Sequence, residues 1–319
     1  MNNFILKPQF LAITFIFAPL FSCQSTMTAS SHTIDIDQEL LRESVHEYKM
    51  ALKKNPTNTG LHHKLGIALV RSRQYKQAVR HLEKGSPQEK DSFENTFYLA
   101  EAYRGLEKFA QAIFYYNKAL TYDSQNKDTL TALSWSYFRI RYYSEALATS
   151  QRVLKIAPRH TEGAIILART LLKLNQPQKA GQVIKKSRKT AQKNMRPYLD
   201  SVIGDIYYSQ HSYNKSIQSY RRALRKEPML AGALFGLGKC LIQKGRPKAA
   251  IHYMKEALKI RPQYSDIHFQ LAKVLEQDDP KSSLNHYKKF RGMSHSDPEH
   301  LNQVREAQRK IQILKNKTF

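Results

Sequence analysis

Residues 99–112 read LAEAYRGLEKFAQA, and residues 237–250 read LGKCLIQKGRPKAA. Each stretch begins with leucine and a small residue, and each ends with an alanine thirteen positions after the leucine. On a helix Leu99 and Tyr103 share one face, because residues four apart lie above one another. A small residue on that face lets a second helix approach closely. These stretches therefore predict two short helices that pack tightly against each other.

The same spacing recurs along most of the chain. The apolar position repeats every 34 residues, with one step of 36 between the fourth and fifth copies. It is occupied by Leu65, Leu99, Leu133, Leu167, Ile203, Leu237 and Leu271. One pair of helices cannot bury its own apolar face, so each unit must stack on the next. The pattern therefore predicts an all-α solenoid.

This spacing resembles the tetratricopeptide repeat. The resemblance covers roughly residues 38–298 and implies a right-handed superhelix of about seven helix pairs over residues 38–297. Residues 40–54 carry only the second half of the motif and predict an N-terminal cap. Residues 298–319 predict a C-terminal capping helix, and docking to a membrane or a partner helix is its alternative role. The apolar face of that helix holds Leu301, Val304, Ala307, Ile311 and Leu314.

The chain is strongly basic, with 52 Lys and Arg against 26 Asp and Glu and a formal charge of +26. Such a balance favours an anionic partner, which could be nucleic acid, a lipid surface or an acidic protein. A solvated face is one interpretation of the densest basic cluster, and contact with anionic headgroups is the other. That cluster comprises Lys185, Lys186, Arg188, Lys189, Arg221, Arg222, Arg225 and Lys226.

The N-terminal residues have features typical of an export signal. Residues 10–21, FLAITFIFAPLF, form an apolar run of 12 residues, which is too short to span a bilayer but suits a signal peptide. The LFSC sequence at residues 20–23 resembles a bacterial lipobox. The resemblance implies cleavage after residues 1–22 and lipid attachment to Cys23. Residues 23–37 then form the lipidated cysteine and a flexible tether. An ordinary signal peptide and an uncleaved anchor are the alternatives.

The residue after the lipobox bears on location. Lipoprotein sorting implies that Gln24, because it is not Asp, directs a Gram-negative lipoprotein to the outer membrane. We therefore expect a lipid-anchored protein of the cell envelope, at the outer membrane and facing the periplasm. An exported protein would not meet RNA, which disfavours nucleic acid as its partner.

The sequence contains no arrangement of residues that predicts catalysis, so we expect no enzyme activity, no cofactor, no metal and no small-molecule substrate. Cys240 is the only cysteine besides Cys23, and with Cys23 lipidated no disulfide is expected. His62 and His63 are adjacent, so on a helix they point in different directions, which disfavours a shared metal.

The family resemblance implies a concave groove that binds a protein or peptide, with contacts at the second, fifth, ninth, twelfth and thirteenth positions of each unit. Packing is the alternative role for the phenylalanines at these positions. Trp135 is the only tryptophan and stands beside Arg139, as expected for a binding hot spot. The candidate groove residues are His63, Phe97, Glu101, Arg104, Trp135, Phe138, Arg139, Arg169, Asp205, Tyr208, Phe235, Lys239, Phe269 and Lys273.

Together these features predict a membrane-tethered scaffold in a secretion, pilus, outer-membrane or cell-wall assembly. Two other functions stay open at this level. One is a basic helical-repeat protein that binds an anionic polymer or nucleic acid. The other is an accessory regulator of a cell-wall enzyme.

Overall fold

The computed structural model describes residues 31–85, 91–294 and 300–318. Within these ranges the regular structure is helical and contains no strand, which confirms the predicted all-α solenoid. The helices are α1 (Ser31–Lys54), α2 (Thr59–Arg71), α3 (Tyr75–Leu82), α5 (Phe93–Gly105), α6 (Phe109–Tyr122), α7 (Lys127–Arg139), α8 (Tyr143–Ile156), α9 (Thr161–Lys173), α10 (Pro177–Thr190), α11 (Arg196–Ser209), α12 (Tyr213–Lys226), α13 (Ala231–Gln243), α14 (Pro247–Ile260), α15 (Ser265–Leu275), α16 (Pro280–Ser294) and α17 (Leu301–Thr318).

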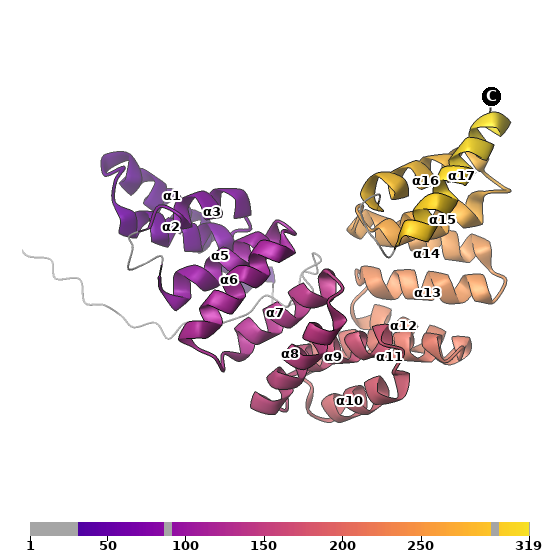
Figure 1. Ribbon diagram of the computed structural model, residues 1–319, viewed down its shortest axis with the longest axis horizontal. Coiled ribbons are helices and arrows are strands. Elements are labelled where there is room, and N and C mark those ends of the chain that lie inside the picture. The colour runs from indigo at the N-terminus through magenta and orange to yellow at the C-terminus, as the bar shows by residue number, and fades with distance from the viewer. Residues whose placement is uncertain (1–30, 86–90, 295–299, 319) are drawn as a thin grey trace, which may run out of the picture.

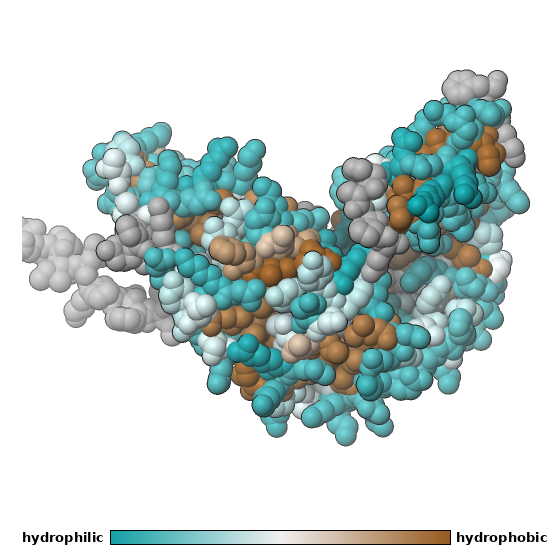
Figure 2. Space-filling model, in the orientation of Figure 1, coloured by the Kyte–Doolittle hydropathy of each residue, from teal (hydrophilic) through white to brown (hydrophobic). Residues whose placement is uncertain are grey.

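The helices form a curved stack of seven antiparallel pairs between two terminal helices (Figure 1). The first helices of the pairs are α2, α5, α7, α9, α11, α13 and α15, and each packs on the second helix that follows it. The stack turns most sharply around α8 to α10, so that the N-terminal and C-terminal arms stand on either side of a hollow (Figures 1 and 2).

Most first helices share local features at their ends: four begin with a side-chain cap, and six end in the same tight turn. Asn126 shows the start, because its side-chain oxygen accepts a hydrogen bond from the backbone N–H of Thr129 at 3.0 Å and caps the helix. The end is a tight turn whose second residue has a positive φ. Only one of these turn residues is glycine, so the repeat holds the others in a conformation that L-residues rarely adopt. The turn residues are Arg73, Glu107, Arg141, Asn175, His211 and Gly245.

A tyrosine of a second helix packs between two neighbouring first helices. The Tyr220 ring on α12 is fully buried and lies directly against Gly204 of α11 and Gly236 of α13. Its hydroxyl donates a hydrogen bond to Asp205 at 2.6 Å. Burial raises the pKa of this hydroxyl, and the nearby Asp205 carboxylate raises it further. Tyr220 is therefore an uncharged donor that fills the space two glycines leave.

The longer step of the repeat lies between α10 and α11, as the period predicts: the linker and the start of α11 are each one residue longer than in the preceding unit. This linker contains a short 3-10 helix, η1 (Lys193–Met195), and buries Ala191 and Met195. In the last pair α15 ends two residues early, and α16 begins nine residues after Leu271, one fewer than in the preceding pair. Ser283 and Tyr287 of α16 are fully buried in packing positions.

Both ends of the stack are covered by a helix. At the C-terminus α17 packs on α16 through Val304, Ala307, Ile311 and Leu314, which are all buried. Leu301, expected on the same face, is instead 48% exposed because it begins the helix and lies beyond the surface that α16 offers. At the N-terminus α1 begins at Ser31, earlier than the predicted start at residue 40.

None of the helices in the described ranges is long and apolar enough to cross a membrane. The predicted signal peptide and Cys23 lie outside the described residues. Cys240 is buried in α13, where its thiol donates to the Ser216 hydroxyl at 3.1 Å and burial raises its pKa.

Two histidine pairs of the same design occur in the first and last units. His62 Nε2 lies 3.0 Å from the carbonyl oxygen of Pro56, and its Nδ1 lies 2.8 Å from His81 Nδ1. A carbonyl can only accept, so His62 carries its proton on Nε2 and accepts at Nδ1 from His81. His268 and His286 repeat this arrangement, with Pro262 as the acceptor.

Three of these four histidines have lowered pKa values. Burial lowers the pKa of His81, and His62, Lys84 and Lys49 add to that effect. The pKa of His286 falls to about 4 through burial, with His268, Lys289 and Lys255 as further causes and Asp279 opposing them. Burial lowers the pKa of His268 as well, and the hydrogen bond to the Pro262 carbonyl opposes that change.

Acidification should therefore destabilise the fold through these pairs. Below pH ~6.5 these histidines bind protons more readily in the unfolded protein than in the folded pairs. Their contribution to the free energy of unfolding is therefore fully present above that pH and decreases as the pH falls toward 4. Asn at 81 and 286 would keep an N–H donor near the Nδ1 position without titrating. We expect H81N/H286N to lose less stability than the parent between pH 7.5 and pH 5, measured by urea midpoints. The exposed His46→Asn serves as control, and equal acid losses in the parent and the double variant would contradict this assignment.

The glycine contacts of Tyr220 give a second prediction. An alanine methyl at Gly236 would overlap the Tyr220 ring, whereas one at Gly232 on the same helix meets no atom of the described residues within 4 Å. We expect Gly236→Ala to destabilise the fold by about 1–3 kcal/mol. Gly232→Ala should instead stabilise it by up to ~1 kcal/mol through helix propensity. Chemical denaturation of both variants tests this, and similar shifts of one sign in the two would refute the packing role.

Candidate partner-binding trough

The inner surface of the stack is centred on an aromatic and cationic patch of α7. Trp135 and Phe138 stack with ring centroids 5.4 Å apart. The Arg139 guanidinium lies 4.4 Å from the Phe109 ring centroid and 5.9 Å from that of Trp135. All three side chains of α7 are half-buried, so they are held in place while still presenting surface. Rigid aromatic anchors beside a guanidinium are typical of binding hot spots.

The same alternation of rings and cations continues on the later units. Lys239 Nζ lies 4.5 Å from the Tyr208 ring centroid, and it bridges α11 and α13. Lys273 Nζ lies 5.5 Å from the Phe269 ring centroid. We call the surface formed by these side chains the inner trough. It comprises Trp135, Phe138, Arg139, Arg169, Tyr208, Lys239 and Lys273.

The inner faces of distant units converge around Tyr264, which lies between α14 and α15. Burial raises the pKa of the Tyr264 hydroxyl, and the charges of Arg169 on α9 and Asp205 on α11 also act on it. Burial lowers the pKa of Arg139, which faces Glu107 and Arg261. The trough is therefore narrow enough for units three and seven to influence each other.

A polar contact joins the two arms directly. His300, just before α17, donates from Nε2 to the Asp266 carboxylate at 2.8 Å. Its Nδ1 then accepts from the Arg141 guanidinium, in the turn between α7 and α8, at 3.2 Å. The repeat pattern did not predict a role for these three residues or for Tyr264. Arg141 and His300 are 159 residues apart, and this separation has no periodic signal.

Four of the first helices have an acidic residue in the first turn and a basic residue in the last turn. Glu162 on α9 is the most perturbed of these acids, because burial and, to a smaller extent, the Asp128 carboxylate on α7 raise its pKa to about 7. Opposite charges at these ends complement the helix dipole. The charge at this edge of the trough therefore changes close to neutral pH. The first-turn acids are Glu94, Asp128, Glu162 and Asp266, and the last-turn bases include Arg104, Arg139 and Lys273.

Several residues predicted for the groove lie inside the protein. Phe97, Phe235 and Phe269 are 8%, 7% and 3% exposed and belong to the core clusters, so packing is the role the structure gives them. His63 is buried against Asn95 and Glu94. These four positions do not offer a surface to a partner.

The predicted groove acids are engaged internally as well. Glu101 accepts hydrogen bonds from Arg104 on its own helix and from the Tyr116 hydroxyl on α6. Asp205 accepts from Tyr220. These contacts hold second helices against first helices, so the carboxylates are mainly structural.

The predicted basic cluster maps to the outer surface. Its members lie on α10 and α12, the second helices of units four and five. No group of three or more His, Cys, Asp or Glu residues that could hold a metal ion occurs in the described part of the chain.

Family models match parts of the repeat array. A family model described as "Tetratricopeptide repeat" matches residues 63–128 and 202–265. A second, described as "Anaphase-promoting complex, cyclosome, subunit 3", matches residues 106–187. A search of curated protein sequences found no match.

Solved structures share the fold at low sequence identity. Yeast Tom70 aligns with a TM-score of 0.60 and 17% identity over 91% of this chain and 61% of Tom70. A chain of the APC/C Cut9–Hcn1 hetero-tetramer aligns with a TM-score of 0.58 and 16% identity, over 84% of this chain and 52% of that chain. PilW, described as a widely conserved type IV pilus biogenesis factor, aligns with a TM-score of 0.50 and 16% identity over 67% of this chain and 97% of PilW. The chain thus spans between half and two thirds of the length of the first two, and at these identities the likeness shows the fold alone.

Proposed function

We propose that this chain, which is built of tetratricopeptide repeats, is a non-enzymatic scaffold that binds a peptide or helix of a partner protein in its inner trough. The observation that carries the proposal is the patch formed by Trp135, Phe138 and Arg139. A stacked aromatic pair with an adjacent guanidinium supplies apolar area and a directional cation at low entropic cost. The patch lies midway along the stack, where an occupant can also contact Tyr208 and Lys239.

We also propose that the protein is anchored by lipid at the cell envelope. The lipobox-like LFSC sequence supports lipid attachment at Cys23 and a tether to the cell envelope, with Gln24 favouring the outer membrane. Several acyl chains on one residue would anchor the protein durably, because each buried CH₂ adds about 0.8 kcal/mol. Secretion, pilus, outer-membrane and cell-wall machines are the assemblies to consider. Pilus assembly is the first to test, since PilW has a similar fold.

Substitutions in the patch should separate partner binding from folding. We expect Trp135→Ala and Arg139→Glu each to reduce partner recovery about tenfold or more in a crosslinking pull-down from membranes, as removal of a hot spot does. Lys155→Glu, an exposed change on the outer helix α8 of the same unit, is the matched control. Circular dichroism should show that all three variants remain folded. Unchanged recovery of crosslinked partners by both folded patch variants would refute the inner trough as the binding site.

Lipidation has its own test. The chain contains two cysteines, so Cys23→Ala and Cys240→Ala form a matched pair. With a clickable palmitate analogue in a bacterial host, we expect label and membrane retention to be lost in Cys23→Ala and kept in Cys240→Ala. Label that persists in Cys23→Ala, or an unmodified Cys23 in the mature protein by mass spectrometry, would show the tether to be absent.

A further inference from the structure

One second helix lacks a side chain that the other six pairs possess. The residue after the packing Ala or Ser of each second helix is a large aliphatic, except in α10, where it is Gly181. The corresponding residues are Val79, Ile113, Leu147, Ile217, Ile251 and Leu284. These aliphatic side chains pack against the core clusters and close the seam between neighbouring units.

Close packing does not account for this glycine. A methyl group at Gly181 would meet no atom of the described residues within 4 Å. Its backbone is ordinary α-helix, so no special conformation requires glycine. A glycine in a helix interior destabilises the helix relative to alanine. What glycine does at this position is leave the seam open.

The open seam is a groove of about 790 Å³ between α10 and α12, which we call the outer groove. Its floor is apolar and is formed by Ile203, Ile206 and Tyr207 of α11 together with Ile184 of α10. The longer linker between α10 and α11 lies at the same junction. The outer groove faces away from the inner trough, because it lies between second helices.

The walls of the outer groove are basic. Lys185, Arg188 and Lys189 line it from α10, and Lys215 and Arg222 line it from α12. Neither helix contains an Asp or Glu. No carboxylate lines the groove among the described residues.

Asp200 of α11 positions the two arginines on opposite walls. Its carboxylate lies 3.4 Å from Arg188 and 3.4 Å from Arg222, while Asp200 itself is almost buried. Each guanidinium is thereby oriented but keeps further donors for a ligand. The Arg222 Nε is buried without an acceptor among the described residues.

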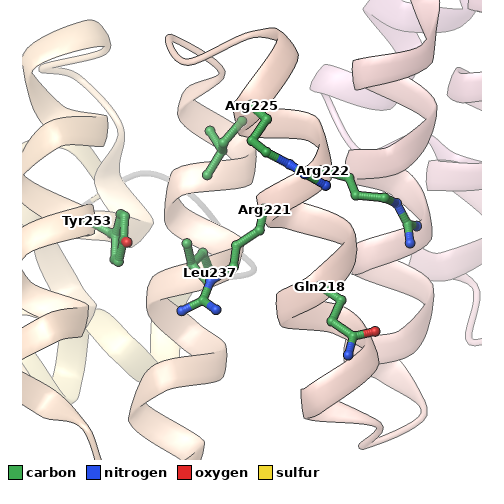
Figure 3. A pocket seen from close by; sticks show the side chains of 7 residues that line it. Gln218, Arg221, Arg222, Arg225, Leu237 and Tyr253 are labelled. Atoms are coloured by element: carbon green, nitrogen blue, oxygen red, sulfur yellow. The ribbon is translucent and has the colours of Figure 1, made fainter.

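A second cavity of about 600 Å³ continues the surface on the other side of α12. Arg222 and Gln218 line both cavities. Figure 3 shows Arg221 directed toward Leu237 and Tyr253, whereas Arg222 and Gln218 extend toward the opposite side of α12. α12 is therefore a basic ridge with an apolar-floored channel on each side.

We propose that the outer groove binds an acidic amphipathic segment of a partner protein. The apolar side chains of that segment would lie on Ile203, Ile206 and Tyr207, and its carboxylates would meet Lys185, Lys189 and the two arginines. A recessed apolar floor needs an occupant that projects into it, as one face of an amphipathic helix does. A flat bilayer of anionic headgroups would reach only the tips of the basic side chains. The geometry thus favours a protein segment, and this site is additional to the inner trough.

The experiment uses the full chain in detergent and a fluorescent 18-residue peptide with Leu at helical spacing and Glu elsewhere. We expect saturable binding that weakens with salt. The same residues in an order that abolishes the apolar stripe should bind at least tenfold more weakly. Gly181→Ile restores the aliphatic found in the other pairs, so it should raise the melting temperature or leave it unchanged. It should weaken peptide binding at least tenfold.

Charge reversal on α10 provides a matched pair. Lys189→Glu lies in the groove wall and should weaken peptide binding, whereas Lys186→Glu, exposed on the same helix but outside the groove, should not. Failure of the peptide to bind, or equal binding by folded Gly181→Ile, overturns the proposal. Stronger competition by phosphatidylglycerol vesicles than by unlabelled peptide identifies a lipid surface as the occupant and also overturns it. Trp135→Ala should leave peptide binding unchanged, which distinguishes this site from the inner trough.

Discussion

The structure depends on the close approach of each second helix to two first helices. Two helices of about 13 residues cannot hide their apolar faces from water alone, so every pair relies on its neighbours. The approach is possible because small residues stand where the helices cross, and Tyr220 between Gly204 and Gly236 shows how tight it is. Curvature, inner surface and outer seams all follow from the repetition of this contact.

The sequence predicted the features that repeat. Each copy of the repeat has the same local packing, which is visible in the 34-residue spacing, the small residues and the alternation of first and second helices. The all-α solenoid and the longer step after the fourth pair were therefore predictable. Contacts between distant units were not. The link from Arg141 through His300 to Asp266 depends on the accumulated curvature of several pairs, and no single repeat encodes it.

Positions within a repeat were harder to assign to surface or core. Phe97, Phe235 and Phe269 occupy a position that the family resemblance associates with ligands, yet they are buried here. Rings of the following second helices pack against two of them, Tyr116 against Phe97 and Phe290 against Phe269, and Tyr264 packs against Phe235. Glu101 and Asp205 were likewise placed by position alone, and the tyrosines that bind them come from the following helix. Trp135, Phe138 and Arg139 remain partly exposed, although Phe138 packs against Tyr143 of the following helix.

A repeat protein supplies its own controls, because each unit can be compared with the others at the same position. Two departures from the pattern occur close together in the sequence, namely the glycine at position 181 in the second helix of the fourth pair and the longer linker that follows this helix. Close packing does not require the glycine, since a methyl at Gly181 would meet nothing in the described structure. Both lie beside the two helices that carry five cations each and no carboxylate. Random drift would scatter such changes among the units, whereas a binding requirement would gather them around one seam, as they are here.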